Sequence, residues 1–351
     1  MDFKKEIKPF SQILGQERAI GFLKSAMARE KIPHAFLFTG IPGVGKTTTA
    51  IALAQAINCL EPVENEGCGR CLMCRRIISG VISGNFPDLL TIEPDGQNIK
   101  IEQIRELNRR LNYRPVVGDY RVTIIKQAEV MTEEAANSFL KTLEEPPLGN
   151  ILILETVEPR DLLSTIVSRC QKIPFQPLSF HVIEEWLRAE MNMDEGKASL
   201  ISRLSEGSLG RAINISENTF LEERQDHLSK ITQLPTISKE QVMGIALEYA
   251  GRFKKINKDS DGAVSTEVSE LMGLWKTWYR DLILMKVNGP AELLINADFS
   301  RKLKGMSIKS SIDKLIECFL ILDQAQRDLN RNLNTGLMME NTYLNLKRLS
   351  G

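Results

Sequence analysis

The sequence predicts an α/β fold with a parallel sheet in the first half of the chain and helices alone in the second half. Up to about residue 176, short apolar runs alternate with helical patterns, as they do where helices pack on both faces of a parallel sheet. A glycine-rich segment directly follows the first apolar run and precedes a helical stretch. After Pro177 the apolar runs stop, and amphipathic helical patterns continue.

Four apolar runs are expected to form the strands, at residues 35–39, 89–92, 122–125 and 151–154. Three helices are expected beside them, from Thr47 to about Asn58, across residues 101–111, and from about Thr132. Apolar side chains at helical spacing indicate the second of these helices. The third has a predicted core stripe of Ala136, Phe139, Leu140 and Leu143.

These patterns divide the chain into three predicted domains: an α/β domain at 1–176, a small helical domain at 177–219 and a larger all-helical domain at 220–351. Breaks between helices are expected at Gly196, Gly207, Pro235, Gly289–Pro290 and Gly305, and an exposed loop is expected near residue 260. The near-helical spacing of Trp275, Trp278 and Tyr279 favours a core or a subunit contact over a base-stacking surface.

Composition excludes several classes of protein. The chain has 351 residues, with 45 Lys and Arg against 45 Asp and Glu, so we do not expect it to bind nucleic acid on its own. No stretch approaches 18 uninterrupted apolar residues, and the opening segment MDFKKEIKPF lacks the apolar core of a secretory signal. We therefore expect a cytoplasmic protein without a membrane segment.

Residues 40–47, GIPGVGKT, fit the phosphate-binding pattern GxxxxGK[ST] between a predicted strand and a predicted helix. The glycines allow backbone N–H groups to converge on phosphate oxygens at the start of a helix. Lys46 would reach the β- and γ-phosphates, and the Thr47 hydroxyl would bind Mg²⁺. The sequence thus predicts a site for ATP or ADP with Mg²⁺, formed by Gly40, Pro42, Gly43, Val44, Gly45, Lys46, Thr47 and Thr48.

Hydrolysis of the nucleotide is not expected. A P-loop ATPase needs a carboxylate at the end of a nearby strand to organise Mg²⁺, and usually a second one to orient water. The best candidate strand, at residues 122–125, is followed by Lys126 and Gln127, which can neither bind a cation nor act as a base. Glu129, two positions further on, is the alternative carboxylate.

Four of the six cysteines, Cys59, Cys68, Cys71 and Cys74, follow the pattern C-x8-C-x2-C-x2-C. Four thiolates at this spacing suit a tetrahedral, structural Zn²⁺ that leaves no open position for catalysis. An iron–sulfur cluster is the alternative, although the spacing differs from the bacterial ferredoxin pattern. Cys170 and Cys318 are expected to be small packing residues.

At these motifs the sequence resembles the clamp-loader branch of the AAA+ ATPases, and within it the delta-prime family of bacterial DNA polymerase III subunits. The resemblance rests on FSQILGQERA, the P-loop, the four-cysteine insertion, AANSFLKTLEEPP and the Ser168-Arg169-Cys170 triplet. It implies a AAA+ domain with its zinc module at 59–74, a helical lid domain and an all-α collar that holds five subunits together. It also implies that Gly15 and Gln16 lie against the adenine.

The resemblance further implies a function. The chain would join delta and gamma/tau subunits in a hetero-pentamer that loads the sliding clamp onto primed DNA, as part of a DNA-directed DNA polymerase holoenzyme. Arg169 would act as an arginine finger on the ATP of a neighbouring subunit, where it can raise the rate greatly. A surface salt bridge is the alternative role for Arg169.

Departures from the family pattern distinguish its members. In the motor subunit gamma/tau, Asp-Glu stands at the positions of Lys126 and Gln127. The second sensor segment here reads Gly207-Ser208-Leu209-Gly210, with Arg211 displaced by one position, and the first sensor is Thr156 or Val157. These losses favour a subunit that binds nucleotide without hydrolysing it. Two alternatives remain: a gamma/tau-type motor ATPase, and a self-contained P-loop enzyme acting on a small molecule.

Overall fold

The computed structural model describes residues 8–83, 85–217, 220–256, 261–328 and 335–350, which divide into two compact units. The first unit is Met1–Ile183 together with Glu206–Arg211, and the second is Glu184–Ser205 together with Ala212–Gly351. The sheet belongs to the first unit, and the described part of the second is helical. Among the described residues, every helix is too short or too polar to span a membrane.

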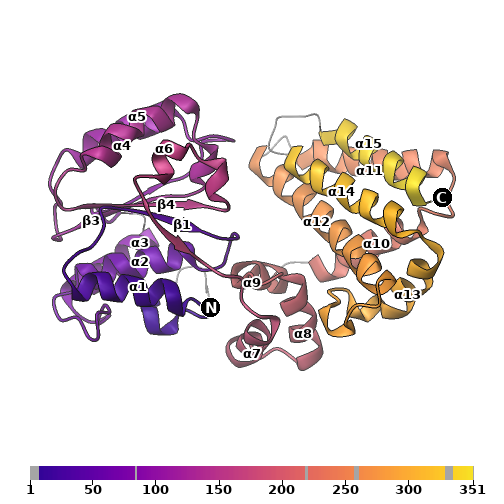
Figure 1. Ribbon diagram of the computed structural model, residues 1–351, viewed down its shortest axis with the longest axis horizontal. Helices are drawn as coiled ribbons and strands as arrows, with labels where there is room; N and C mark the ends of the chain where they lie inside the picture. The colour runs from indigo at the N-terminus through magenta and orange to yellow at the C-terminus, as the bar shows by residue number, and fades with distance from the viewer. Residues whose placement is uncertain (1–7, 84, 218–219, 257–260, 329–334, 351) are drawn as a thin grey trace. The chain divides into compact units, whose positions relative to one another are not determined.

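A parallel sheet of five strands forms the centre of the first unit (Figure 1). Its strands are β1 Ala35–Thr39, β2 Leu89–Ile92, β3 Arg121–Ile125, β4 Asn150–Thr156 and β5 Gln171–Pro174, in the spatial order β2-β3-β4-β1-β5. The predicted parallel α/β class is confirmed. Since Thr39 of β1 pairs with Thr156 of β4, the loop that follows β1 begins beside the carboxyl end of β4.

The sequence pattern located four of the five strands. Every residue of β3 and β4 is buried, and strands buried on both faces read as continuous apolar runs. β5 was missed because its segment QKIP buries only Ile173 between exposed residues. Its position at the edge of the sheet explains this weak pattern.

Helices cover both faces of the sheet (Figure 1). One face carries α1 Glu17–Ala28, α2 Lys46–Ile57 and α3 Leu72–Ser83, and the other carries α4 Ile101–Leu111, α5 Glu133–Glu144 and α6 Ser164–Val167. Along β4, Ile151 and Ile153 pack on the α2 side and Leu152 and Leu154 on the α5 side. Because side chains alternate along a strand, Glu155 lies on the α2 side.

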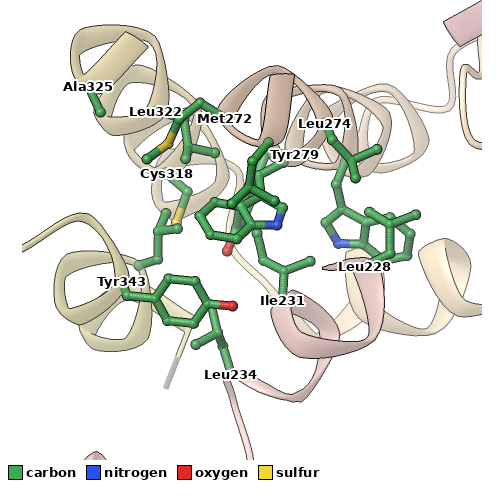
Figure 2. Close-up of a cluster of buried hydrophobic side chains, with 14 of the residues drawn as sticks. Leu228, Ile231, Leu234, Met272, Leu274, Tyr279, Cys318, Leu322, Ala325 and Tyr343 are labelled. Carbon is green, nitrogen blue, oxygen red and sulfur yellow. The ribbon is translucent and has the colours of Figure 1, made fainter. Parts of the chain in front are cut away.

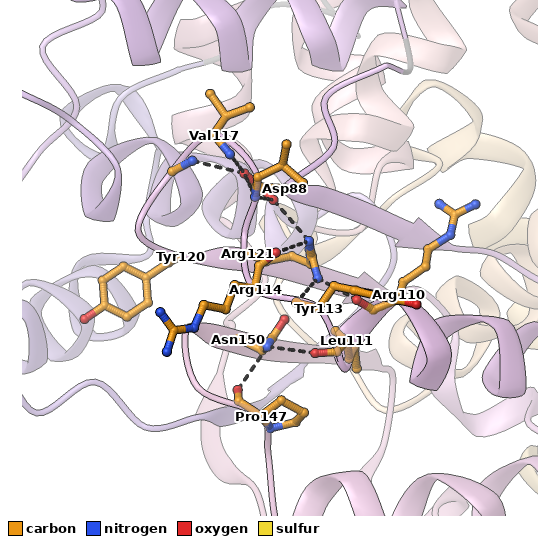
Figure 3. A network of polar contacts seen from close by, with 12 residues as sticks. Asp88, Arg110, Leu111, Tyr113, Arg114, Val117, Tyr120, Arg121, Pro147 and Asn150 are labelled. Atoms are coloured by element: carbon orange, nitrogen blue, oxygen red, sulfur yellow. Dashed lines mark hydrogen bonds and ion pairs between the residues drawn. The ribbon is translucent and has the colours of Figure 1, made fainter.

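A buried ion pair fixes the amino ends of β2 and β3 (Figure 3). Asp88 accepts hydrogen bonds from the backbone N–H groups of residues 116–118 at 2.6–3.0 Å and from the guanidinium of Arg121 at 3.4 Å. Arg121 also donates to the carbonyls of Arg110, Tyr113 and Arg114. Since both charges are almost fully buried, these bonds are what makes their burial tolerable.

The remaining helices are α7 Phe180–Met191, α8 Glu195–Leu204, α9 Leu209–Glu217, α10 Phe220–Gln233, α11 Lys239–Ile256, α12 Asp261–Lys286, α13 Ser300–Lys309, α14 Ile312–Asp328 and α15 Thr335–Ser350. In the second unit, side chains from α10, α12, α14 and α15 meet in one apolar core (Figure 2). Trp275 and Trp278 are fully buried there, and Tyr279 is 4% exposed. Of the two roles predicted for these aromatic residues, a core or a subunit contact, the structure shows the core.

Two predicted helix breaks are wrong. Gly196 lies in the first turn of α8, where the side chain of Asp194 accepts a hydrogen bond from the Lys197 N–H at 2.9 Å and so starts the helix. Gly305 lies inside α13, which buries Leu303 and Ser307 on either side of it; a glycine costs a helix only about 1 kcal/mol.

The other three breaks, at Gly207, Pro235 and Gly289–Pro290, lie between helices as predicted. The predicted loop near residue 260 falls partly on residues 257–260, which lie outside the described residues. Helices α11 and α12 reach Ile256 and Asp261 on its two sides, so the helical structure extends further than the pattern indicated.

Candidate functional site

The P-loop joins β1 to α2 through backbone conformations that favour glycine. Gly43 and Gly45 have φ angles of +73° and +107°, which other residues rarely adopt. A Cβ atom added at Gly43 would also lie 2.5 Å from the Ser208 hydroxyl oxygen. Both the turn of the loop and the contact with the segment 206–211 therefore require glycine at position 43.

Lys46 is buried at the start of α2, and its ammonium group donates hydrogen bonds to the carbonyls of Gly40 and Ile41 within the loop. Burial lowers the pKa of Lys46, while the charges of Glu155 and Glu129 oppose the shift. The two carboxylates belong to different segments of the chain, and both favour the charged form of Lys46.

Two further segments hold the P-loop from outside. Gln16 is 3% exposed, and its amide donates to the carbonyls of Val44 at 3.4 Å and Gln176 at 2.8 Å. On the other side, Ser208 donates its hydroxyl to the Pro42 carbonyl at 2.8 Å, and the Gly210 N–H donates to the Gly43 carbonyl at 2.9 Å. These contacts fix the loop between two segments distant in sequence.

The predicted sensor residues have distinct environments. Arg211 forms an ion pair with Glu206, and its backbone N–H donates to the Ser208 hydroxyl at 3.1 Å. Of the two residues considered for the first sensor, Thr156 is buried at the end of β4 and donates to the Glu158 carbonyl, whereas Val157 is apolar and 37% exposed.

At the end of β3, Lys126 forms an ion pair with Glu93, with Nζ and Oε1 2.6 Å apart. Gln127 is exposed and has a φ angle of +49°. Glu129, the alternative carboxylate, lies in the short helical turn Ala128–Val130, and its Oε2 atom is buried without a hydrogen-bond partner among the described residues.

Glu155 of β4, whose side chain is hydrogen-bonded to the P-loop helix, was not predicted from the sequence. The hydroxyl of Thr47 donates a hydrogen bond to Glu155 Oε2 at 2.9 Å. Glu155 is 6% exposed, and burial raises its pKa, against the opposing effects of the Thr47 hydrogen bond and the Lys46 charge. The signal was available, because an acidic residue directly follows the apolar run at 151–154.

The structure brings the four predicted zinc ligands together. All four sulfur atoms lie within 4.8 Å of one another, and three of the separations are 3.6 Å (Cys59–Cys74), 3.9 Å (Cys59–Cys71) and 4.0 Å (Cys68–Cys74). Tetrahedral Zn²⁺ with Zn–S bonds of about 2.3 Å requires sulfur atoms about 3.8 Å apart. The donor set and its spacing therefore fit a zinc ion.

Backbone N–H groups surround these sulfur atoms. The N–H of Cys68 donates to Cys59 Sγ and that of Cys71 to Cys68 Sγ, both at 3.3 Å. Hydrogen bonds from the backbone of Arg70 and Cys71 lower the pKa of Cys68, which favours the thiolate form that binds metals. The module also contacts α1, since Glu66 forms an ion pair with Lys24 and accepts a hydrogen bond from Ser11.

Arg169 lies two residues beyond α6, with 35% of its side chain exposed. Its guanidinium pairs with the carboxylate of Glu144, at the end of α5, and donates to the Thr165 carbonyl at 2.9 Å. The neighbouring Cys170 is half-buried, and burial raises its pKa to about 12. Burial likewise raises the pKa of Cys318 to about 11. Cys170 packs against the apolar cluster on the α5 side of the sheet, and Cys318 lies in the core of the second unit.

The sheet order and the P-loop at the end of β1 define a P-loop α/β protein with a helical C-terminal part. The sequence model of the family described as "DNA polymerase III, delta subunit" matches residues 15–179. The chain is 31% identical to the DNA polymerase III subunit delta′ of Bacillus subtilis (strain 168) over 333 residues, which is 95% of this chain and 96% of that one. It therefore belongs to the DNA polymerase III delta-prime family, in the clamp-loader branch of the AAA+ proteins.

Two other relatives cover the chain differently. The tau subunit of the same polymerase from B. subtilis (strain 168) is 31% identical over 216 residues, which is 60% of this chain and 38% of that one. Among solved structures, a DNA polymerase III gamma subunit-related protein from Thermotoga maritima aligns with 94% of this chain and 99% of its own, at 21% identity and a TM-score of 0.43.

Proposed function

We propose that this clamp-loader subunit binds ATP or ADP with Mg²⁺ without hydrolysing it, and supplies Arg169 to the ATP of a neighbouring subunit. Its partners would be delta and gamma/tau subunits in a cytoplasmic hetero-pentamer that loads the sliding clamp onto primed DNA. The observation that carries the proposal is the residue pair at the end of β3, where Lys126 and Gln127 stand in the place of carboxylates.

Nucleotide binding is supported by the P-loop geometry. The left-handed glycines, the buried Lys46 and the Thr47 hydroxyl supply the groups that hold phosphates and Mg²⁺. Turnover also needs a base or a water-orienting residue. Gln127, which is exposed and follows an ion-paired lysine, cannot accept a proton from water.

The partial exposure of Arg169 supports a role in trans. An exposed ion pair such as Arg169–Glu144 contributes about 0.2–1 kcal/mol. An arginine finger contributes about 10³–10⁵ in rate, or roughly 4–7 kcal/mol at 1.36 kcal/mol per tenfold. Releasing Arg169 from Glu144 therefore costs far less than its contact with a γ-phosphate would contribute.

The cysteine module supports a structural zinc. With four thiolates as ligands, the ion would have no open position for water or substrate. Its role would be to cross-link the end of α2 to the start of α3, because Cys59 follows α2 and Cys74 lies in α3.

A gamma/tau-type motor ATPase is the second candidate. The observation that favours it is the intact P-loop, whose Thr47 is bonded to a buried carboxylate. Calorimetric titration with ATP and an ATPase assay of the isolated chain separate the two. Binding without measurable turnover is the result expected here. Robust hydrolysis that Lys46→Ala abolishes would support the motor instead, and the absence of any nucleotide binding would remove the proposal.

A further inference from the structure

Glu155 is a buried carboxylate on β4, the strand beside β1. It accepts a hydrogen bond from Thr47, which follows Lys46 at the start of the P-loop helix α2. We infer that Glu155 is a positioning residue for a divalent cation bound with the nucleotide, and that it orients Thr47 toward that cation in place of the carboxylate that Lys126 has replaced. The inference rests on the proposed nucleotide binding at the P-loop.

The sheet register places Glu155 where such a residue is needed. β4 lies between β1 and β3, and Glu155 pairs directly with Phe38, two residues before the P-loop begins. On the other side, the last pair between β3 and β4 is Ile125 with Leu154. Lys126 directly follows β3, and Glu155 is the next residue of β4, so Glu155 lies one strand away from Lys126 at the same level of the sheet.

The direction of the hydrogen bond matters. A threonine hydroxyl has one proton to donate and two lone pairs to offer. Thr47 directs its proton to Glu155 Oε2 at 2.9 Å, which leaves its oxygen lone pairs for a cation. Carboxylates and hydroxyls are oxygen donors of the kind that Mg²⁺ prefers, and a residue that fixes the orientation of a metal ligand commonly governs affinity for the metal.

The other carboxylate oxygen of Glu155, Oε1, is available to bind a ligand. Oε1 is buried and has no hydrogen-bond partner among the described residues. Glu155 as a whole is 6% exposed, so bulk water does not satisfy this oxygen. The nearby cations are engaged elsewhere, since Lys46 donates to loop carbonyls and Lys126 pairs with Glu93. A buried carboxylate oxygen without a partner is costly, and a cation or a water molecule bound to it would satisfy it.

This arrangement would separate metal binding from hydrolysis. Glu155 provides a carboxylate beside the proposed cation. Gln127 is not a base, and it stands after the strand end where the motor subunit has one. A chain built this way holds nucleotide more tightly with Mg²⁺ than without it and still does not turn it over.

The test is calorimetric titration of the full chain with ATP, once in excess Mg²⁺ and once in EDTA. We expect wild type to bind more tightly in Mg²⁺. Glu155→Gln should reduce this gain by roughly 10- to 100-fold, the range for loss of a residue that orients a metal ligand, while affinity in EDTA stays the same or rises. Glu158→Gln makes the same change at an exposed position three residues away and should keep the wild-type gain.

Glu155→Asp provides the conservative variant, because it keeps the charge and shortens the side chain by one methylene. It should restore part of the gain, and it tests the inference independently if Glu155→Gln does not fold. An unchanged Mg²⁺ gain in either variant overturns the role of Glu155, as does equal wild-type affinity in Mg²⁺ and EDTA, which would leave nucleotide binding intact. No binding in either buffer would overturn the proposed nucleotide site itself.

Discussion

Arg169 of the Ser-Arg-Cys triplet is ion-paired with Glu144 of the LKTLEEPP segment. The Ser-Arg-Cys and LKTLEEPP segments, which most clearly resemble clamp-loader motifs, therefore contact each other through Arg169. Arg169 is also the side chain proposed to act on a neighbouring subunit. The pair lies at the surface, between the ends of α5 and α6, where an ion pair holds an arginine in one orientation without holding it tightly.

Glu144→Gln should leave ATP hydrolysis by the reconstituted clamp loader unchanged or raise it by up to about fivefold, the effect of releasing a pair that contributes at most about 1 kcal/mol. The measurement is steady-state hydrolysis with clamp and primed DNA present. Glu145→Gln, a neighbouring exposed carboxylate, is the control and should have no effect. A large loss in Glu144→Gln would mean that the pair itself holds the active geometry.

Lys46→Ala should weaken ATP binding by about 10- to 100-fold, since a hydrogen bond to a charged group contributes roughly 1.5–3 kcal/mol. The protein should remain folded, because the hydrogen bonds of the ammonium group within the described part of the chain go to two carbonyls of its own loop. Isothermal titration measures the loss, and Lys31→Ala, at an exposed position, should bind as wild type does. Equal affinity in the two variants would contradict a phosphate role for Lys46.

Elemental analysis should find about one zinc per chain. Cys71→Ser should lose the metal and lower the thermal midpoint, because a structural zinc contributes folding free energy directly. Cys170→Ser should keep the metal, since Cys170 lies outside the cluster. Bound iron with visible absorption would instead indicate an iron–sulfur cluster.

Asp88→Ala should destabilise the sheet unit by about 3–5 kcal/mol, the cost of leaving a buried charge without its partner. Arg121 would remain buried at 4% exposure of its side chain, and three backbone N–H groups would lose their acceptor. Chemical denaturation measures the effect. Asp119→Ala, at an exposed position nearby, should change stability little; equal losses in the two variants would refute the account of the ion pair.

Much of the fold could be predicted because its signals are local. β1 and β2 have the predicted bounds, and the P-loop and the cysteine cluster are complete within short segments. β5 was missed because an edge strand with one buried residue, Ile173, has no distinct pattern. Helices α8 and α13 tolerate glycines that the sequence alone suggests as breaks, because capping and packing outweigh the intrinsic cost.

The part of the site that escaped prediction is held by contacts between distant residues. Thr47 and Glu155 are 108 residues apart, and Gln16 and Gln176 are 160 apart. A sequence identifies residue types at each position, but only the strand order brings Glu155 beside the P-loop helix. The same holds for Glu144 and Arg169, each of which belongs to a recognisable motif whose mutual contact neither motif indicates.

Single-turnover ATP hydrolysis in the reconstituted clamp loader tests whether Arg169 acts on the ATP of a neighbouring subunit. With Arg169→Ala, hydrolysis at the site that receives this arginine should slow by about 10³-fold or more, while the chain's own affinity for nucleotide stays at the wild-type value. Arg160→Ala, an exposed arginine nearby, should hydrolyse ATP as wild type does. An unchanged rate with Arg169→Ala would contradict the claim.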